Sequence, residues 1–316
     1  MAIRQSTVQI GARWCGASDD MRGLVALLLG SVFSAAACGQ IIVRNDENLA
    51  SDRPEAWAMN YFAASTLMTG FGRTPALAPW QWSVAADLAH IPRLSDAQQR
   101  VGFNGVKRED LNKSPLFGRL RLLLGLPGDW VAELGYTPPL TINGAQPRDF
   151  VAVALGHRVF ERDRFTLSAR ALGQHGRVRG DITCPGTLAG VADVEHNPFG
   201  CRSPSNDRVT LNYYGAELTS AWTAEAWEAH ASFGAVRTEL AVQVDALTFD
   251  VRDRSRLVSR SVVPFATLGA TRELGARWNL GLELLYVPLQ VRRRADAARE
   301  DDALTSLRLE LRYRVD

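Results

Sequence analysis

The stretch that decides the fold is Leu307-Arg308-Leu309-Glu310-Leu311-Arg312-Tyr313-Arg314-Val315, close to the end of the chain. An apolar side chain stands at every second position and a charged one stands between. Because successive side chains of a strand point to opposite faces, this period of two predicts a strand with one apolar and one ionic face.

The same alternation recurs along most of the chain. Ten strand-like runs can be marked, an even count of the kind that single-chain bacterial barrels show, and twelve strands is the alternative count. These runs are 80–91, 116–126, 129–140, 149–160, 164–180, 208–221, 226–240, 257–273, 277–291 and 304–315. Runs of about ten residues are long enough to cross a bilayer core as tilted strands.

The connections between the runs alternate strictly between short and long. Short turns lie at 127–129, 161–163, 223–225 and 273–275, and longer polar links lie at 92–115, 141–148, 181–207, 241–256 and 292–303. Short periplasmic turns and long extracellular loops are typical of outer-membrane barrels. The sequence therefore predicts an all-β protein, a closed antiparallel transmembrane β-barrel spanning residues 80–316 with its C-terminus in the periplasm.

The last strand also resembles a known signal. Residues 307–315 resemble the C-terminal assembly signal of bacterial outer-membrane β-barrel proteins, although the chain ends in Val315-Asp316 rather than in phenylalanine. The resemblance covers only these nine residues and implies insertion by the barrel assembly machinery. It indicates no specific transporter or enzyme family.

The first part of the chain has the features of an exported protein. Residues 21–37 fit a signal peptide, with Met21-Arg22 as the basic start and Ala35-Ala36-Ala37 as a small-residue cleavage site. Cleavage is expected near Cys38, and lipidation of this cysteine is the alternative to ordinary cleavage. Residues 1–20 resemble no leader and suggest a mis-assigned start. We therefore expect the protein in the outer membrane of a Gram-negative bacterium.

Residues 38–79 are predicted to be a periplasmic lead-in that contains one short helix. Pro54 suits an early helical position, Asp52 is a candidate cap, and the segment to Met68 lacks strand-like alternation. A first strand over 54–70 is the alternative. With the helix the lead-in either stays below the barrel or enters its lumen.

The polar phase of the strands predicts what faces the barrel interior. The expected lumen network consists of Asp87, Arg119, Arg121, Glu133, Arg170, Glu217, Glu228, His230, Glu283, Arg308, Glu310 and Arg312. In a narrow barrel these nearly balanced charges are expected to pair, since isolated buried charges are costly. The network is interpreted as structural packing, with a path for small anions along four of its arginines, Arg119, Arg121, Arg308 and Arg312, as the alternative.

The two cysteines within the barrel region lie in one long link. Cys184 and Cys201 are predicted to form a disulfide, because an oxidising compartment favours it and two cysteines alone make a poor metal site. The loop they close is either a cover for the barrel mouth or a surface for a ligand.

The overall charge and the motifs limit the classes of function. A net charge of +2 gives no electrostatic case for nucleic acid, and no phosphate or nucleotide motif occurs, so no cofactor and no catalytic or metal residue is assigned. The predicted function is a passive small-solute channel or a structural barrel, in contact with outer-membrane lipid and lipopolysaccharide. The alternatives are an outer-membrane hydrolase, for which His175 and His196 are the rim candidates, and a surface adhesion barrel. An enzyme is not favoured.

Overall fold

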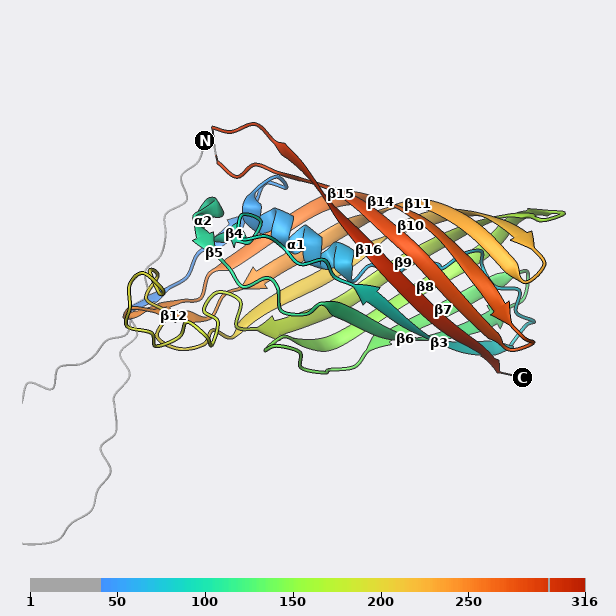
Figure 1. Ribbon diagram of the computed structural model, residues 1–316, viewed down its shortest axis with the longest axis horizontal. Coiled ribbons are helices and arrows are strands. Elements are labelled where there is room, and N and C mark those ends of the chain that lie inside the picture. Colours follow the sequence, from blue (N-terminus) through green and yellow to red (C-terminus); the bar gives the residue numbers. More distant parts are fainter. Residues whose placement is uncertain (1–40, 295, 316) are drawn as a thin grey trace, which may run out of the picture.

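The computed structural model describes residues 41–294 and 296–315 of the chain. The predictions for the extension 1–20, the signal peptide 21–37 and cleavage near Cys38 lie outside these residues. The structure is mostly strand, and it forms one closed barrel with a helix inside it (Figure 1).

The barrel has ten antiparallel strands. The main sheet has eleven strands, one of which is the short parallel addition β2, and the pairing of β11 with β14 closes the other ten into a ring. The ten strands are β3 (Trp82–His90), β6 (Leu116–Leu126), β7 (Trp130–Thr137), β8 (Gln146–Arg162), β9 (Phe165–Gly180), β10 (Asp207–Ala224), β11 (Trp227–Gln243), β14 (Arg256–Leu274), β15 (Trp278–Val291) and β16 (Glu300–Val315). The last strand, β16, pairs with the first, β3, so the predicted fold class and closure are confirmed.

The two ends of the barrel differ as predicted. Two- or three-residue turns join β6 to β7, β8 to β9, β10 to β11 and β14 to β15, and the C-terminus lies at the same end (Figure 1). We call this the short-turn end and the other the long-loop end. Several strands are longer than predicted, since the run 304–315 begins at Glu300 and the run 208–221 ends at Ala224. The run 129–140 is shorter than predicted and ends as a strand at Thr137, directly before Pro138 and Pro139. Proline has no N–H to continue the ladder.

The barrel is apolar outside and charged inside. Along β16, Leu307, Leu309 and Leu311 are 51%, 40% and 41% exposed, whereas Arg308, Glu310 and Arg312 are buried. Exposed aromatic residues lie toward both ends of the strands, among them Trp130 with Tyr136 and Trp278 with Tyr286. A soluble protein would show the reverse pattern. The protein is therefore an outer-membrane β-barrel whose apolar exterior faces lipid.

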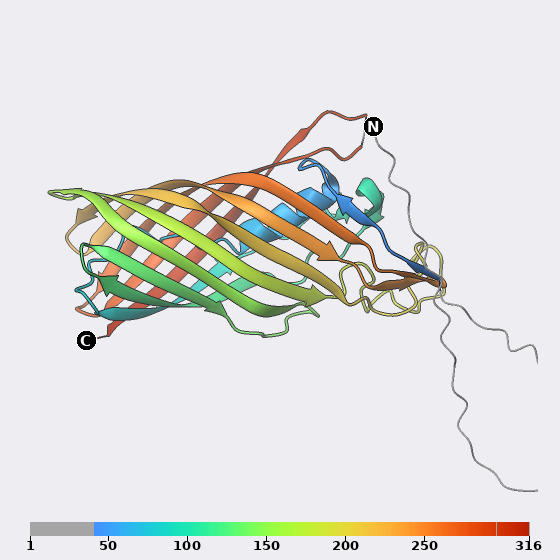
Figure 2. The same cartoon turned by 180° about the vertical axis from the view of Figure 1, so that it is seen from behind.

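The predicted helix exists and lies within the barrel. Helix α1 (Pro54–Ser65) begins with Pro54 at its first turn and buries eleven of its twelve residues, and Figure 2 shows it surrounded by strands. A helix that is apolar on all sides needs cover on all sides. The N-cap is Arg53 rather than the predicted Asp52, and Arg53 donates two hydrogen bonds of 3.1 Å to the Glu55 carboxylate. No helix in the described part of the chain is long and apolar enough to cross a membrane.

The start of the described chain differs from the predicted periplasmic lead-in. Strand β1 (Ile41–Val43) runs parallel to β13 (Val251–Asp253) in the long link that also carries β12 (Ala246–Thr248). Strand β2 (Asp46–Asn48) runs parallel to the first residues of β14. Both lie at the long-loop end, opposite the C-terminus (Figure 1). An even strand count places only the ends of the strands, so it does not place the segment that precedes them.

From this position the chain passes down through the lumen. After α1, residues 66–79 continue toward the short-turn end, where the Trp80 N–H donates to the Gly125 carbonyl at 2.8 Å and β3 begins soon after. We call residues 54–79 the lumen segment. At the long-loop end, the link between β3 and β6 contains β4 (Arg100–Val101), α2 (Gly102–Gly105) and β5 (Lys107–Arg108).

Candidate functional site

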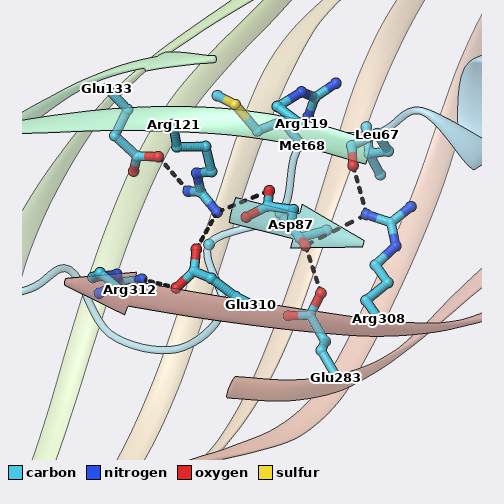
Figure 3. Close-up of polar contacts among 12 residues, drawn as sticks. Leu67, Met68, Asp87, Arg119, Arg121, Glu133, Glu283, Arg308, Glu310 and Arg312 are labelled. Atoms are coloured by element: carbon cyan, nitrogen blue, oxygen red, sulfur yellow. Dashed lines mark hydrogen bonds and ion pairs between the residues drawn. The ribbon is translucent and has the colours of Figure 1, made fainter. Parts of the chain in front are cut away.

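The centre of the barrel wall carries a buried ion network. Arg121 on β6 contacts the carboxylates of Asp87 at 3.4 Å and Glu310 at 2.7 Å, and it also binds Glu133 on β7 (Figure 3). Arg312 binds Glu310 at 2.5 Å. Because Arg121 meets three carboxylates from three other strands, its charge is fully compensated, as burial requires.

Arg170 extends this network along the wall to β9 and β10. Its guanidinium on β9 binds Glu133 at 2.8 and 2.9 Å and Glu217 on β10 at 3.1 Å. Glu133 therefore links two arginines from strands that lie on either side of it. The same Arg170 side chain also donates to the Met68 carbonyl at 2.9 Å, so it joins the wall to the lumen segment.

Three arginines of the wall bind carbonyls at the C-terminal end of α1 and in the three residues that follow it. Arg119 donates to the Thr66 carbonyl at 2.7 Å, Arg308 donates to the carbonyls of Leu67 and Ala64, and Arg170 donates to Met68. The last carbonyls of a helix lack partners within it, and they carry the negative end of the helix dipole. Arg119 and Arg308 satisfy both requirements, and Arg170 holds the chain just beyond the helix; we call these three residues, from three different strands, the arginine clamp.

The backbone that follows the helix is satisfied by side chains of the wall in turn. The Met68 N–H donates to the Tyr213 hydroxyl at 2.9 Å, the Arg73 N–H to Glu228 at 2.9 Å, and the Thr74 N–H to the Ser168 hydroxyl at 3.0 Å. Buried backbone groups without such partners would be costly. The lumen segment is therefore docked by specific contacts over its length.

A second cluster of polar side chains contacts the lumen segment after the clamp, around Thr69 and Arg73. The Thr69 hydroxyl donates to Glu283, and the His230 Nε2 atom lies 3.6 Å from the same carboxylate. Arg73 binds Glu228 at 2.9 Å, and Glu228 lies 4.0 Å from the other ring nitrogen of His230. Both nitrogens of the buried His230 ring lack a hydrogen-bond partner.

The structure places the predicted lumen residues in three sets. Seven form the wall network: Asp87, Arg121, Glu133, Arg170, Glu217, Glu310 and Arg312. Arg119 and Arg308 form the second set and bind the lumen segment. The third set, Glu228, His230 and Glu283, lies around Thr69 and Arg73. The four arginines suggested as an anion path are thus engaged by carboxylates or by carbonyls.

Several partners were missed from the sequence. Gln174 accepts a hydrogen bond from Arg119 at 2.7 Å, and Tyr213 donates to the Thr66 carbonyl at 3.2 Å. Both stand four residues from a predicted inward residue, Arg170 or Glu217, so extending the inward phase would have found them. The carbonyls of the lumen segment leave no signal in a side-chain pattern.

The long-loop end is closed by contacts among its links. Cys184 and Cys201 form the predicted disulfide. Lys107 binds Glu109 at 2.7 Å and the Thr183 carbonyl, and Lys113 binds Asp181 at 2.7 Å. Burial raises the pKa of Glu109 to about 8, although the Lys107 ammonium beside it favours the ionised carboxylate. These contacts join the disulfide link to the link between β3 and β6 over the barrel mouth.

The two rim candidates for hydrolysis lie apart from each other, His175 on β9 and His196 within the loop that the disulfide closes. His175 is an exposed, outward-facing residue of β9, while His196 contacts Asp193 at 2.5 Å in an exposed pair. Hydrogen bonds from the Glu195 N–H and from His196 lower the pKa of Asp193. Within residues 41–294 and 296–315, no group of three or more His, Cys, Asp or Glu side chains is arranged to hold a metal ion.

Comparisons with known proteins find similar folds at low identity. No protein-family model matches this chain, and no curated protein sequence matches it. The outer-membrane protease OmpT from Escherichia coli has a TM-score of 0.40 at 9% identity, over 75% of this chain and 94% of that one. The attachment invasion locus protein Ail of Yersinia pestis has a TM-score of 0.30 at 12% identity, over 75% and 100%. The toluene transporter TodX of Pseudomonas putida has a TM-score of 0.32 at 8% identity, over 79% and 95%. The fold assignment accordingly rests on the strand pairing of this chain.

Proposed function

We propose that this outer-membrane β-barrel is a gated passage for small solutes, held closed at rest by its own lumen segment. The observation that carries the proposal is the arginine clamp, in which three strands of the wall bind carbonyls at and directly after the end of α1. A barrel that served only as a membrane scaffold would have no need of a segment docked through its centre.

The charges of the lumen favour a closed resting state over an open anion path. Arg121 and Arg170 are neutralised by Asp87, Glu133, Glu217 and Glu310, and the remaining clamp arginines hold backbone carbonyls. Ions would have to break these contacts to pass. Passage therefore requires displacement of the lumen segment. This displacement separates the carbonyls of the segment from the wall arginines that bind them.

The surface contacts proposed for the protein follow from its exterior. The apolar band contacts outer-membrane lipid, and the long links face lipopolysaccharide. The basic run Arg292-Arg293-Arg294 is partly neutralised within the chain, since Arg292 binds Asp52 at 3.0 Å and Arg293 binds Glu300 at 3.1 Å. Among the residues that the structure describes, neither a rim hydrolase nor an adhesion surface has a comparable built site to support it.

Planar-bilayer recording tests this proposal. The wild-type protein is expected to be closed most of the time, with rare ohmic steps. The double variant Arg119→Met, Arg308→Met loses two of the three clamp residues and is expected to open far more often. Arg312→Met is the matched control, because Arg312 is also a buried arginine of β16 but binds Glu310 and not the lumen segment. A wild-type protein that conducts steadily, with the same open fraction as the double variant, would overturn the proposal.

A further inference from the structure

The wall of the barrel is incomplete on one side. Strand β7 has 8 residues, whereas its neighbours β6 and β8 have 11 and 17. Its pairing with β6 stops at Leu120 and Tyr136, and its pairing with β8 stops at Thr137 and Phe150. Beyond these points, residues 116–119 of β6 and 146–149 of β8 face each other across a gap without a strand between them.

The sequence explains why β7 stops there. Thr137 is followed by Pro138 and Pro139, which cannot donate to a neighbouring strand. Pro147 in turn lies in the part of β8 that faces the gap, a place where a proline costs no ladder hydrogen bond. The link between β7 and β8 bows outward in Figure 1, and its residues Pro138, Leu140 and Ile142 border the gap. Prolines therefore border the gap both where β7 ends and where β8 begins.

A cavity of about 410 Å³ fills this gap and passes through the wall. On the lumen side it is lined by Phe62, Thr66 and Leu211, which are residues of the lumen segment and of β10. On the outer side it is lined by Leu88 and Leu120, whose side chains are about half exposed toward the lipid. The cavity therefore connects the hydrocarbon phase of the membrane with the end of α1.

The charged groups that line the cavity have partners within the chain. Lys113 binds Asp110 and Asp181, both at 2.7 Å. Arg119 is held by the Thr66 carbonyl and Gln174, and Asp87 faces Arg121. No cation of the lining is left to hold a phosphate or carboxylate headgroup. The rest of the lining is mainly aliphatic and aromatic, with a few hydroxyl-bearing residues.

We infer that this cavity is a binding site for a small uncharged hydrocarbon that enters sideways from the membrane through the gap between β6 and β8. Ligand pockets commonly span roughly 300–1,000 Å³, and an apolar cavity of about 150 Å³ already accepts benzene. A cavity of about 410 Å³ therefore suits a molecule with one or two aromatic rings, or an alkane of similar size. The ligand would touch Thr66 and Arg119, so it would meet the clamp directly.

The binding site does not depend on the gated passage, and its test uses no conductance. Radiolabelled naphthalene is equilibrated with the full protein in lipid nanodiscs, and saturable binding is measured against empty nanodiscs. Ala86 lines the cavity from the lipid side, where a larger side chain needs no repacking of the lumen. Ala86→Phe is expected to weaken naphthalene binding at least about tenfold by filling part of the site. Ala216→Phe, an outward-facing alanine of β10 away from the cavity, is the matched control and should bind like the wild type.

The outcomes separate the hydrocarbon from a lipid chain. Saturable binding that Ala86→Phe weakens and Ala216→Phe preserves supports the site. Binding that does not exceed empty nanodiscs overturns it. A phospholipid retained by the wild type and lost in Ala86→Phe, without saturable naphthalene binding, also overturns it, because the occupant is then an acyl chain of the bilayer.

Discussion

Replacing Arg308 with methionine should release the end of α1 from the wall. Arg308 donates to the Leu67 carbonyl and, at 3.2 Å, to the Ala64 carbonyl, and both contacts are buried. Methionine keeps much of the aliphatic volume but offers no donor. The Leu67 carbonyl would then lose its side-chain donor inside the barrel, and the Ala64 carbonyl would keep only backbone donors, among them the Leu67 N–H at 3.2 Å.

The size of the effect follows from these two contacts. A hydrogen bond to a charged group contributes roughly 1.5–3 kcal/mol, so losing two costs about 3–6 kcal/mol of docking free energy. Since about 1.4 kcal/mol corresponds to a tenfold change, the opening equilibrium of the lumen segment should rise roughly 100- to 10,000-fold.

Hydrogen exchange with mass spectrometry measures this change. Peptides from residues 54–79 should lose protection in Arg308→Met, while peptides from the strands keep it and the protein keeps its heat-modifiable migration as a folded barrel. Arg312→Met is the control on the same strand and the same face, and it should leave the protection of residues 54–79 unchanged. Equal protection in Arg308→Met and the wild type, or an equal loss in both variants, would refute the role given to the clamp.

Two further predictions concern the long-loop end. Because burial raises the pKa of Glu109 from near 4.5 to about 8, the folded cover binds its proton more tightly than the unfolded chain does. The local stability of the cover should therefore fall as the pH rises from about 4.5 to 8, by up to about 1.4 kcal/mol per pH unit. Glu109→Gln should remove this pH dependence in hydrogen-exchange measurements corrected for the intrinsic effect of pH. An unchanged pH dependence in the variant would contradict the assignment. Because Val43 lies at the long-loop end and Ala276 in a short turn, a membrane-impermeant maleimide should label Val43→Cys but not Ala276→Cys in intact cells, measured against the labelling of the parent protein; the opposite pattern would reverse the orientation of the barrel.

The strands were predictable because their pattern reports the medium that each face touches. Leu307, Leu309 and Leu311 are exposed and Arg308 and Glu310 are buried, which is what a period of two means when one side is lipid. The alternation of short and long links placed the C-terminus as well. The inward list was readable for the same reason, since a single phase decides the face of every residue in a strand.

The position of the lumen segment was not predictable to the same degree. Trp57 and Tyr61 lie on one side of α1 and Met59 lies on the opposite side, and all three are buried. The sequence therefore indicates a helix that needs cover on more than one side, but it does not say what covers it. The clamp binds carbonyls, which every residue has. Pro138 and Pro139 indicate the end of β7, but the apolar residues around them favoured a longer strand over 129–140.

The most direct test of the central claim is a disulfide between the lumen segment and the wall. A Cβ atom built at Gly156 on β8 would lie 3.7 Å from the Cβ of Thr74, close to the roughly 3.8 Å typical of disulfides. The double variant Thr74→Cys, Gly156→Cys should form this bond spontaneously in the outer membrane, and mass spectrometry of proteolytic peptides should find residue 74 joined to residue 156. If both cysteines instead remain free thiols in a correctly folded barrel, residues 54–79 do not lie where the account requires.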